Sequence, residues 1–255
     1  MRFLLSNDDG IQSDGLRALA LALQQVGEVY VVAPDRERSA ASHAISLHRP
    51  LRIREVADRW WSVDGTPTDC VYLAINHLLR EQRPDVVVSG INYGANLADD
   101  VTYSGTVAAA MEAALLGVPS IAISLACREP FDFTEAAAFA AGLAPQVAER
   151  GLPKGMLLNV NVPEGRPKGY RTTRLGKRSY GSEVVVNVDP RGRKYYWIGG
   201  ADATHVDIPG SDCNAVFDER LISVTPLHLD LTDYRLLEDL RSWEVPGFAA
   251  DERAT

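Results

Sequence analysis

Over residues 1–162 the chain alternates short apolar runs with segments of helical spacing, and this alternation restricts the fold more than any other feature. Strand-like runs cover residues 3–5, 29–33, 85–89, 121–125 and 156–162. Helices are expected between them, over residues 16–23, 66–79, 106–116 and 133–150. Strands separated by helices predict an α/β fold, a Rossmann-like, doubly wound and mainly parallel sheet with right-handed crossovers.

The predicted helix that starts after Thr66 carries the clearest start signal in the chain. Thr66 suits the N-cap, Pro67 suits the first helical position, and Asp69 can reach back as a capping-box acid. Just before it, residues 51–55 and 60–63 are typical of a pair of strands. A long polar segment, residues 36–50, separates this pair from the second core strand.

The composition of the sequence changes after Pro163. Residues 184–188 and 194–198 flank the turn sequence Asp-Pro-Arg-Gly, which predicts a hairpin. Such a hairpin is either an arm that contacts another subunit or an ordinary surface hairpin, and the residues leave both open. A last strand at 221–224 and a last helix at 234–243 follow. We therefore expect one domain, residues 1–255, with a core to about 163, an arm and last strand to about 232, and a C-terminal helix and tail.

Composition excludes several classes of protein. The chain has 255 residues, is 46% hydrophobic and carries a formal net charge of -8, without a long basic run, so nucleic acid is not expected as a partner. Cys70, Cys127 and Cys213 are widely spaced and predict free thiols, not disulfides or a zinc cluster. Neither a leader nor an apolar run of membrane length is apparent, so we expect a cytoplasmic protein that does not contact membranes.

Two adjacent acids, Asp8 and Asp9, follow the first predicted strand. Neighbouring carboxylates repel each other, and a divalent cation between them is the simplest way to relieve that repulsion. The segment Asn-Asp-Asp-Gly is equally typical of a plain turn. Two further polar clusters, residues 35–39 and 89–96, also follow strands of the predicted sheet.

A doubly wound sheet would gather these three clusters at one edge, where ligands bind in open α/β folds. Together they offer the carboxylates of Asp8 and Asp9, the hydroxyl of Ser39 and the amide of Asn92. Oxygen donors of this kind match Mg or Mn, whereas zinc prefers Cys and His.

The segment Ser104-Gly105-Thr106 leads into an alanine-rich helix. A helix N-terminus presents free N–H groups and partial positive charge, so this segment suits a phosphate group. The alternative is that Ser104 or Thr106 merely caps the helix. Arg36 and Arg38 are either further phosphate contacts or solvated loop charges.

Signatures of other enzyme classes are missing from the sequence. No GxGxxG follows the first strand, and neither a GxxxxGK[ST] loop nor a GxSxG elbow occurs. Among the five histidines only His43, in the loop beside Ser39, is a candidate proton donor.

Several long segments resemble the SurE survival-protein family of metal-dependent 5′/3′-nucleotidases. They are LLSNDDG at 4–10, VVAPDRERSA at 31–40, GTPTDCVYLA at 65–74, VSGINYGANLADDVTYSGTVAAAMEA at 88–113, DPRGRKYYWIG at 189–199 and ISVTPLHLDLT at 222–232. The resemblance covers nearly the whole chain, and long motifs in the same order make it specific.

The resemblance implies hydrolysis of nucleoside 5′- and 3′-monophosphates to nucleoside and phosphate, and family members are also associated with exopolyphosphatase activity. It places the ligands of one Mg or Mn ion per subunit on Asp8, Asp9, Ser39 and Asn92. It places phosphate contacts on Asn96 and on the segment Ser104-Gly105-Thr106. It further implies a homodimer or homotetramer, in which the hairpin region 170–198 contacts another subunit.

One departure from relatives lies beside the predicted site. The loop after Ser39 often reads Gly-Ala-Ser-Asn in relatives, and here His43 replaces the Asn, so His43 is a predicted substrate or phosphate contact and the change bears on substrate preference. A general acid for the leaving group is not evident, although Asp9 and His43 are candidates.

Two other functions are alternatives to a metal-dependent nucleotidase. One is a phosphoaspartate mechanism with Asp8 as the nucleophile, as in haloacid-dehalogenase-like phosphatases, but those carry DxDx[TV] instead of adjacent acids. The other is a non-catalytic regulator that binds nucleotides through the metal. The predicted catalytic residues are Asp8 and Asp9, which would hold the cation that polarises the phosphoryl group.

Overall fold

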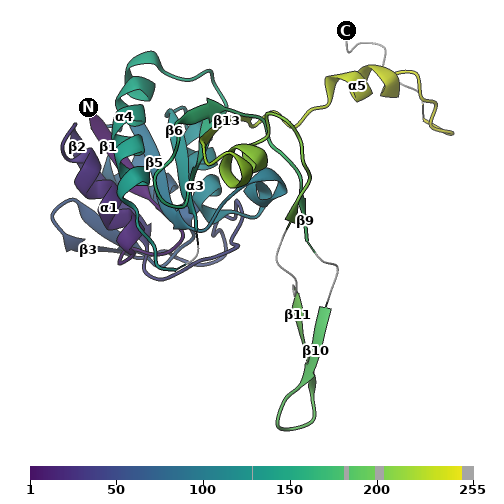
Figure 1. The fold of residues 1–255 in the computed structure, drawn as a ribbon, viewed down its shortest axis with the longest axis horizontal. Helices are drawn as coiled ribbons and strands as arrows, with labels where there is room; N and C mark the ends of the chain where they lie inside the picture. Colours follow the sequence, from purple (N-terminus) through teal and green to yellow (C-terminus); the bar gives the residue numbers. More distant parts are fainter. Residues whose placement is uncertain (128, 181–183, 199–203, 249–255) are drawn as a thin grey trace.

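The computed structural model describes residues 1–127, 129–180, 184–198 and 204–248. In these residues nine strands form one sheet in the order β3-β4-β2-β1-β5-β6-β7-β13-β8 (Figure 1). The strands from β4 to β7 run parallel, while β3 and β13 are antiparallel to β4 and β7. Their bounds are β1 Arg2–Ser6, β2 Glu28–Pro34, β3 Ile53–Ala57, β4 Trp60–Val63, β5 Val86–Tyr93, β6 Ser120–Ala126, β7 Met156–Pro163, β8 Tyr170–Thr172 and β13 Ile222–His228. The predicted doubly wound, mainly parallel sheet is confirmed.

Helices cover both faces of this sheet. On one face lie α1 (Asp14–Leu23) and α4 (Thr134–Arg150), and on the other lie α2 (Pro67–Leu73), extended by the wider turn η1 (Ala74–Leu78), and α3 (Gly105–Leu115). Strand β1 is buried on both sides, because Phe3 and Leu5 pack into the α1–α4 layer and Leu4 into the other. Full burial explains why β1 is an uninterrupted apolar run. The predicted capping box of α2 is present, with Thr66 and Asp69 exchanging hydrogen bonds.

The strand order creates a switch point beside β1. The connection through α1 places β2 on one side of β1, whereas β5, β6 and β7 are added on the other side. In open α/β sheets the carboxyl ends of strands at such a point form the crevice that binds ligands. Here those ends belong to β1 and β5, which pair from Phe3↔Val86 to Ser6↔Ser89.

Strand β5 is longer than predicted. The sequence placed its end at residue 89 and a loop over 90–103, but the strand continues to Tyr93. Its register with β6 shifts between Ser89 and Asn92, after which Asn92 pairs with Ser124 and Tyr93 with Leu125. Burial of Ile91 in the α1–α4 layer favours continued pairing beyond Gly90. Asn92 therefore lies on a strand, and a short 3₁₀ helix, η2 (Ala98–Thr102), occupies part of the predicted loop.

The chain after β7 forms an edge of the sheet and two projections. Strand β8, inside the region predicted as the arm, pairs with β13 at the sheet edge. The arm begins later, with β9 (Arg178–Ser179) paired to β12 (Thr204–His205) at its root, and β10 (Val184–Val188) paired to β11 (Lys194–Ile198) beyond it (Figure 1). Helix α5 (Tyr234–Leu240) also projects from the body and buries none of its residues. None of the helices in the described ranges combines the length and the apolar character needed to cross a membrane.

Candidate active site

The turn after β1 is built by Asn7. Its fully buried amide donates to the carbonyl of Gly10 (3.1 Å) and to the hydroxyl of Ser13 (2.7 Å), and it accepts from the N–H of Gly10 (3.2 Å). Gly10 has a φ of +96°, and a Cβ there would lie 3.0 Å from the carbonyl carbon of Arg36. Only glycine meets both conditions without strain. The turn thus holds Asp8 and Asp9 in a fixed place between β1 and the loop after β2.

Asp8 lies at the N-terminus of α3. Asp8 is 6% exposed, and its carboxylate accepts a hydrogen bond from the Thr106 hydroxyl. Burial raises the pKa of Asp8, while the hydroxyl and the backbone N–H groups of Thr106 and Gly105 act in the opposite direction. A Cβ on Gly105 would sit 2.8 Å from the Cβ of Asp8. The anion that this helix start holds is therefore a carboxylate of the chain itself.

Asp9 is the second acid of the pair, and a backbone hydrogen bond from Tyr93 is the one contact that lowers its pKa. Burial and the charge of Asp8 raise its pKa to about 7, and Glu37 contributes further. Its Oδ2 atom is buried, and no described residue hydrogen-bonds to it. An unpartnered carboxylate oxygen beside a second carboxylate is a costly arrangement, which a divalent cation would relieve. The chemistry of the pair fits a hard cation.

The other two predicted ligands, Ser39 and Asn92, line the same cleft as the acid pair. The amide nitrogen of Asn92 donates to the carbonyl of Gly94 (2.8 Å), so its amide oxygen is the atom that could ligate a cation. The exposed Ser39 donates its hydroxyl to Glu37. Asp8, Asp9, Ser39 and Asn92 all line one cleft of about 960 Å³. In the described part of the chain no three His, Cys, Asp or Glu side chains gather as metal ligands, so a cation here depends on the hydroxyl and the amide as well.

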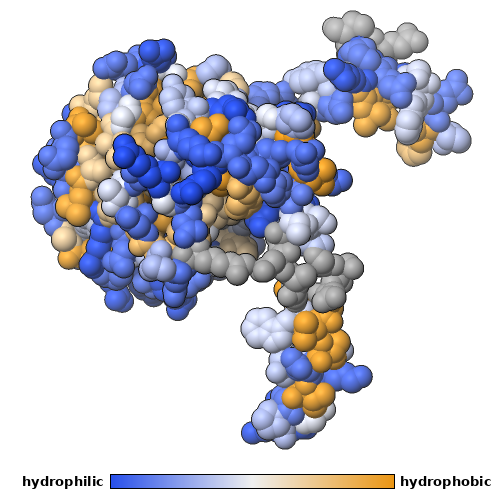
Figure 2. Space-filling model, viewed as in Figure 1, coloured by the Kyte–Doolittle hydropathy of each residue, from blue (hydrophilic) through white to orange (hydrophobic). Residues whose placement is uncertain are grey.

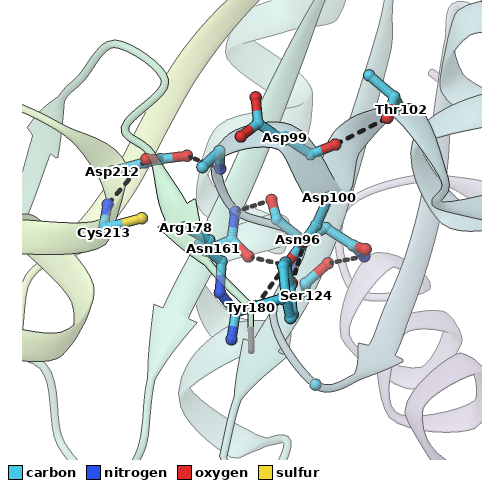
Figure 3. Close-up of polar contacts among 12 residues, drawn as sticks. Asn96, Asp99, Asp100, Thr102, Ser124, Asn161, Arg178, Tyr180, Asp212 and Cys213 are labelled. Atoms are coloured by element: carbon cyan, nitrogen blue, oxygen red, sulfur yellow. Dashed lines mark hydrogen bonds and ion pairs between the residues drawn. The ribbon is translucent and has the colours of Figure 1, made fainter. Parts of the chain in front are cut away.

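Asn96 is held in this cleft by a buried polar network (Figure 3). Its backbone N–H donates to Asn161 Oδ1 (2.8 Å), and its carbonyl accepts from the amides of Asn161 (3.0 Å) and Asn159 (2.8 Å). Its own amide donates to the hydroxyl of Ser124 (2.8 Å). The alternating Asn159 and Asn161 of β7 share one face of that strand. This network fixes a polar side chain at the cleft wall.

The residues of the segment Ser104-Gly105-Thr106 have two different roles. Ser104 caps α3 by accepting from the N–H of Val107 (3.1 Å), and it also lines the cleft. Gly105 and Thr106 are buried and contact Asp8, so the structure gives them a partner other than the predicted phosphate.

Three predicted residues of the loop after β2, Arg36, Arg38 and His43, lie outside the cleft. His43 Nε2 is 2.8 Å from Glu112 Oε2, and His43 is not among the residues that line the cleft. Arg38 donates to the carbonyl of Asp64 (3.1 Å), and Arg36 does not line the cleft either. The structure therefore gives no support to His43 as a proton donor or substrate contact, or to these arginines as phosphate contacts.

Several cleft residues were not anticipated from the sequence, among them Asp100, Arg178 and Tyr180. Asp100 of η2 accepts hydrogen bonds from Arg178 of β9 and from Tyr180, which follows β9 (Figure 3). Arg178 and Tyr180 are about 80 residues from Asp100 in sequence, in a segment whose composition indicated an arm, and they line the cleft at the arm root. The motif GKRSY that contains them has no chemistry of its own that would have placed it at a site.

A Rossmann-like sheet with paired acids at its switch point defines a ligand-binding α/β protein, and comparison with known proteins gives its family. A model of the family "Survival protein SurE" matches residues 3–182. The 5′-nucleotidase SurE of Myxococcus xanthus is 65% identical over 98% of this chain and 96% of its own length. That of Geobacter sulfurreducens is 56% identical over 96% and 94%.

A solved structure supports the same relationship. The crystal structure of the SurE protein from Aquifex aeolicus superimposes with a TM-score of 0.84 at 43% identity, covering 94% of this chain and 98% of that one. The chain belongs to the survival protein SurE family.

Proposed function

We propose that this protein is a divalent-metal-dependent phosphomonoesterase that hydrolyses nucleoside 5′-monophosphates, and also 3′-monophosphates, to nucleoside and phosphate. Relatives named 5′-nucleotidase SurE, at up to 66% identity over 97% of the chain, support this class of enzyme. The structural observation that carries the proposal is the buried, unpartnered Oδ2 of Asp9 beside Asp8 at the switch point of the sheet.

One cation, Mg or Mn, would be held by Asp8, Asp9, Ser39 and Asn92, which line the cleft. Once bound, such an ion supplies positive charge to phosphoryl oxygens and lowers the pKa of a coordinated water molecule. The protein's share is to fix the ligands in place. Thr106 and Gly105 orient Asp8, while the Asn7 turn sets the position of both acids.

Asn96 and Ser104 would bind the phosphoryl group. Both are largely buried and line the cleft, and hydrogen bonds to Asn161, Ser124 and Val107 fix their positions. Donors held in place before the reaction stabilise developing charge without reorganisation, which is the largest contribution in many enzymes. In this scheme the α3 N-terminus acts on phosphate indirectly, through Asp8.

The rival functions gain no support. A nucleotide-binding regulator without turnover is not favoured by relatives that are named as enzymes. A phosphoaspartate route would need Asp8 to be accessible for attack on phosphorus, but the residue is 6% exposed and its carboxylate is in contact with Thr106 and Gly105.

The experiment is an assay of free phosphate from AMP and GMP with Mg²⁺, Mn²⁺ or a chelator. We expect release that requires the metal and is lost in Asp9→Asn. Nucleotide binding without release of phosphate would support the regulator instead. A panel that includes 3′-AMP and short polyphosphate extends the same assay to the other substrates that the family resemblance implies.

We also propose that the protein is a homodimer or homotetramer that assembles through its arm, with the cytoplasm as its location. One face of the hairpin carries Val184, Val186, Tyr196 and Ile198, and all four are more than half exposed. Figure 2 shows this apolar surface on the arm, separate from the body. A lone two-stranded hairpin is at best marginally stable in water, so a cover from a second copy would stabilise it.

A further inference from the structure

The cleft extends from the acid pair to the root of the arm, and its far end is aromatic. Tyr180 lines it there, with 54% of its surface exposed, and Tyr103, which is 67% exposed, lines the same cleft. Within the described part of the chain, neither tyrosine is hydrogen-bonded to a proposed cation ligand. Large exposed aromatic surfaces at a cleft wall indicate a binding surface for a flat, apolar part of a ligand.

Tyr180 is held in place by two neighbours (Figure 3). Its hydroxyl donates to one carboxylate oxygen of Asp100, whose other oxygen pairs with Nη1 of Arg178. The guanidinium of Arg178 packs over the Tyr180 ring, 5.2 Å from its centroid. Burial and the Asp100 carboxylate raise the pKa of Tyr180 above its usual value, so the hydroxyl stays protonated and donates. A ring fixed before binding loses little conformational entropy when a ligand stacks on it.

The charges at this end cancel. Arg178 is the one basic side chain among the described residues that line the cleft, against six acids. Its ion pair with Asp100 is largely buried, since the two side chains are 16% and 15% exposed. A guanidinium neutralised in this way does not compete with the acid-pair end for a phosphate group. The cleft thus has a metal and phosphate end and a neutral, aromatic end.

We propose that Tyr180 stacks against the base of the nucleoside monophosphate, with Asp100 and Arg178 as positioning residues for its ring. The proposal rests on the function proposed above and adds the recognition of the base. Stacking on a tyrosine tolerates any base, because every base has a π-face. Tyr180 would therefore favour nucleotides over sugar phosphates without ranking the bases.

A second aromatic group lines the same cleft, but its rings are occupied with one another. Tyr93 and Phe131 pack edge to face with centroids 4.7 Å apart, and Phe133 packs against both. The Tyr93 hydroxyl also accepts from the N–H of Asp14 (3.0 Å). These three rings form a packed cluster. Tyr180, by contrast, presents to the cleft a ring that Asp100 and Arg178 hold in place.

The test compares AMP with ribose 5-phosphate, which keeps the sugar and phosphate but lacks the base. In Tyr180→Ala we expect the kcat/KM for AMP to fall about tenfold, mainly through KM, with little change for ribose 5-phosphate. Tyr180→Phe keeps the ring but loses its hydrogen bond to Asp100, so its loss for AMP should be smaller than that of Tyr180→Ala. Tyr195→Ala, which removes a tyrosine of the arm outside the cleft, is the matched control and should leave both substrates unchanged.

Equal losses for the two substrates in Tyr180→Ala would overturn the proposal, and so would unchanged AMP kinetics. A selective loss for AMP in Phe131→Ala alone would place the base at the other aromatic group. Calorimetric binding of AMP to the wild type and to Tyr180→Ala gives the same comparison without turnover. If the wild type binds AMP but releases no phosphate, the proposed function fails while the stacking proposal is still decided by that binding difference.

Discussion

The carboxylate of Asp8 lies against Gly105, the first residue of α3, so closely that a Cβ on Gly105 would sit 2.9 Å from Oδ2. Glycine is required here by the carboxylate, because Gly105 has no positive φ that would favour it. The contact brings the start of one helix and the turn after β1 into a single unit. Its consequences for activity can be separated from its consequences for folding.

Gly105→Ala should damage the site more than the fold. The added methyl group must displace the Asp8 carboxylate, and misplacement of about 1 Å at a reacting centre can reduce the rate about 100-fold. Alanine is a good helix former, but its methyl group would also lie 2.8 Å from the Cβ of Asp8, so the variant should lose some stability as well. Phosphate release from AMP and urea unfolding measure the two effects.

Gly142→Ala in α4 is the control for that variant. Gly142 lies within a helix, and a methyl group added to it would meet no heavy atom within 4 Å. The variant should gain about 0.5–1 kcal/mol of stability with unchanged activity. Full activity in Gly105→Ala would mean that Asp8 tolerates displacement and is not a ligand.

Thr106→Val should destabilise the metal-free protein. Valine has the shape of threonine but removes the hydroxyl that donates to the buried Asp8 carboxylate. Leaving a buried acceptor without its donor costs about 1–3 kcal/mol. Urea unfolding with a chelator present measures this cost, and Thr106→Ser, which keeps the hydroxyl, should lose less. Equal stability of the valine variant and the wild type would argue against this hydrogen bond.

Asn161→Leu and Asn159→Leu should differ, although both change buried asparagines of β7. Asn161 satisfies the backbone N–H and carbonyl of Asn96, whereas Asn159 donates only to the carbonyl, and its own Oδ1 has no partner among the described residues. We expect Asn161→Leu to cost about 1–3 kcal/mol of stability and to lower kcat/KM, with a smaller effect for Asn159→Leu. The reverse order would contradict the role assigned to Asn161.

Val186→Asp should separate the subunits. The charge would fall on the hairpin face that carries Val184, Val186, Tyr196 and Ile198. Burying an unpaired charge in an interface is unfavourable, so the variant should elute as a monomer in chromatography with light scattering. Asn187→Asp, on the opposite face of the same strand, is the control. A wild type that is already monomeric would contradict assembly through the arm.

Much of this protein was predictable from its sequence because local signals agreed with the fold. Apolar runs gave the core strands, and the capping box at Thr66 marked the start of α2. Comparison confirms the SurE family, the fold class and the phosphomonoesterase function that the resemblance implied. The acid pair was recognisable because two adjacent carboxylates after a strand repel each other, and a bound cation would relieve that repulsion. The assignment of individual residues to metal and phosphate stays a prediction.

The rest depended on contacts between distant segments. The path of β5 through Asn92 follows from a register shift against β6, which no local pattern encodes. The hydroxyl of Thr106 serves Asp8, 98 residues away, although locally it resembles a helix start that awaits an anion. Arg178 and Tyr180 enter the cleft because the arm root folds back on η2. The composition of their segment indicated only an arm, since this contact is not encoded locally.

The cation site at Asp8 and Asp9 is tested by measuring Mn²⁺ binding to the wild type and to Asp9→Asn. Calorimetry or electron paramagnetic resonance detects the binding. Asp14→Asn, which changes another acid of the same cleft, is the control. We expect one binding event per chain in the wild type and in Asp14→Asn, and its loss in Asp9→Asn with the thermal stability of the metal-free protein retained. Wild-type affinity for Mn²⁺ in Asp9→Asn would contradict this expectation.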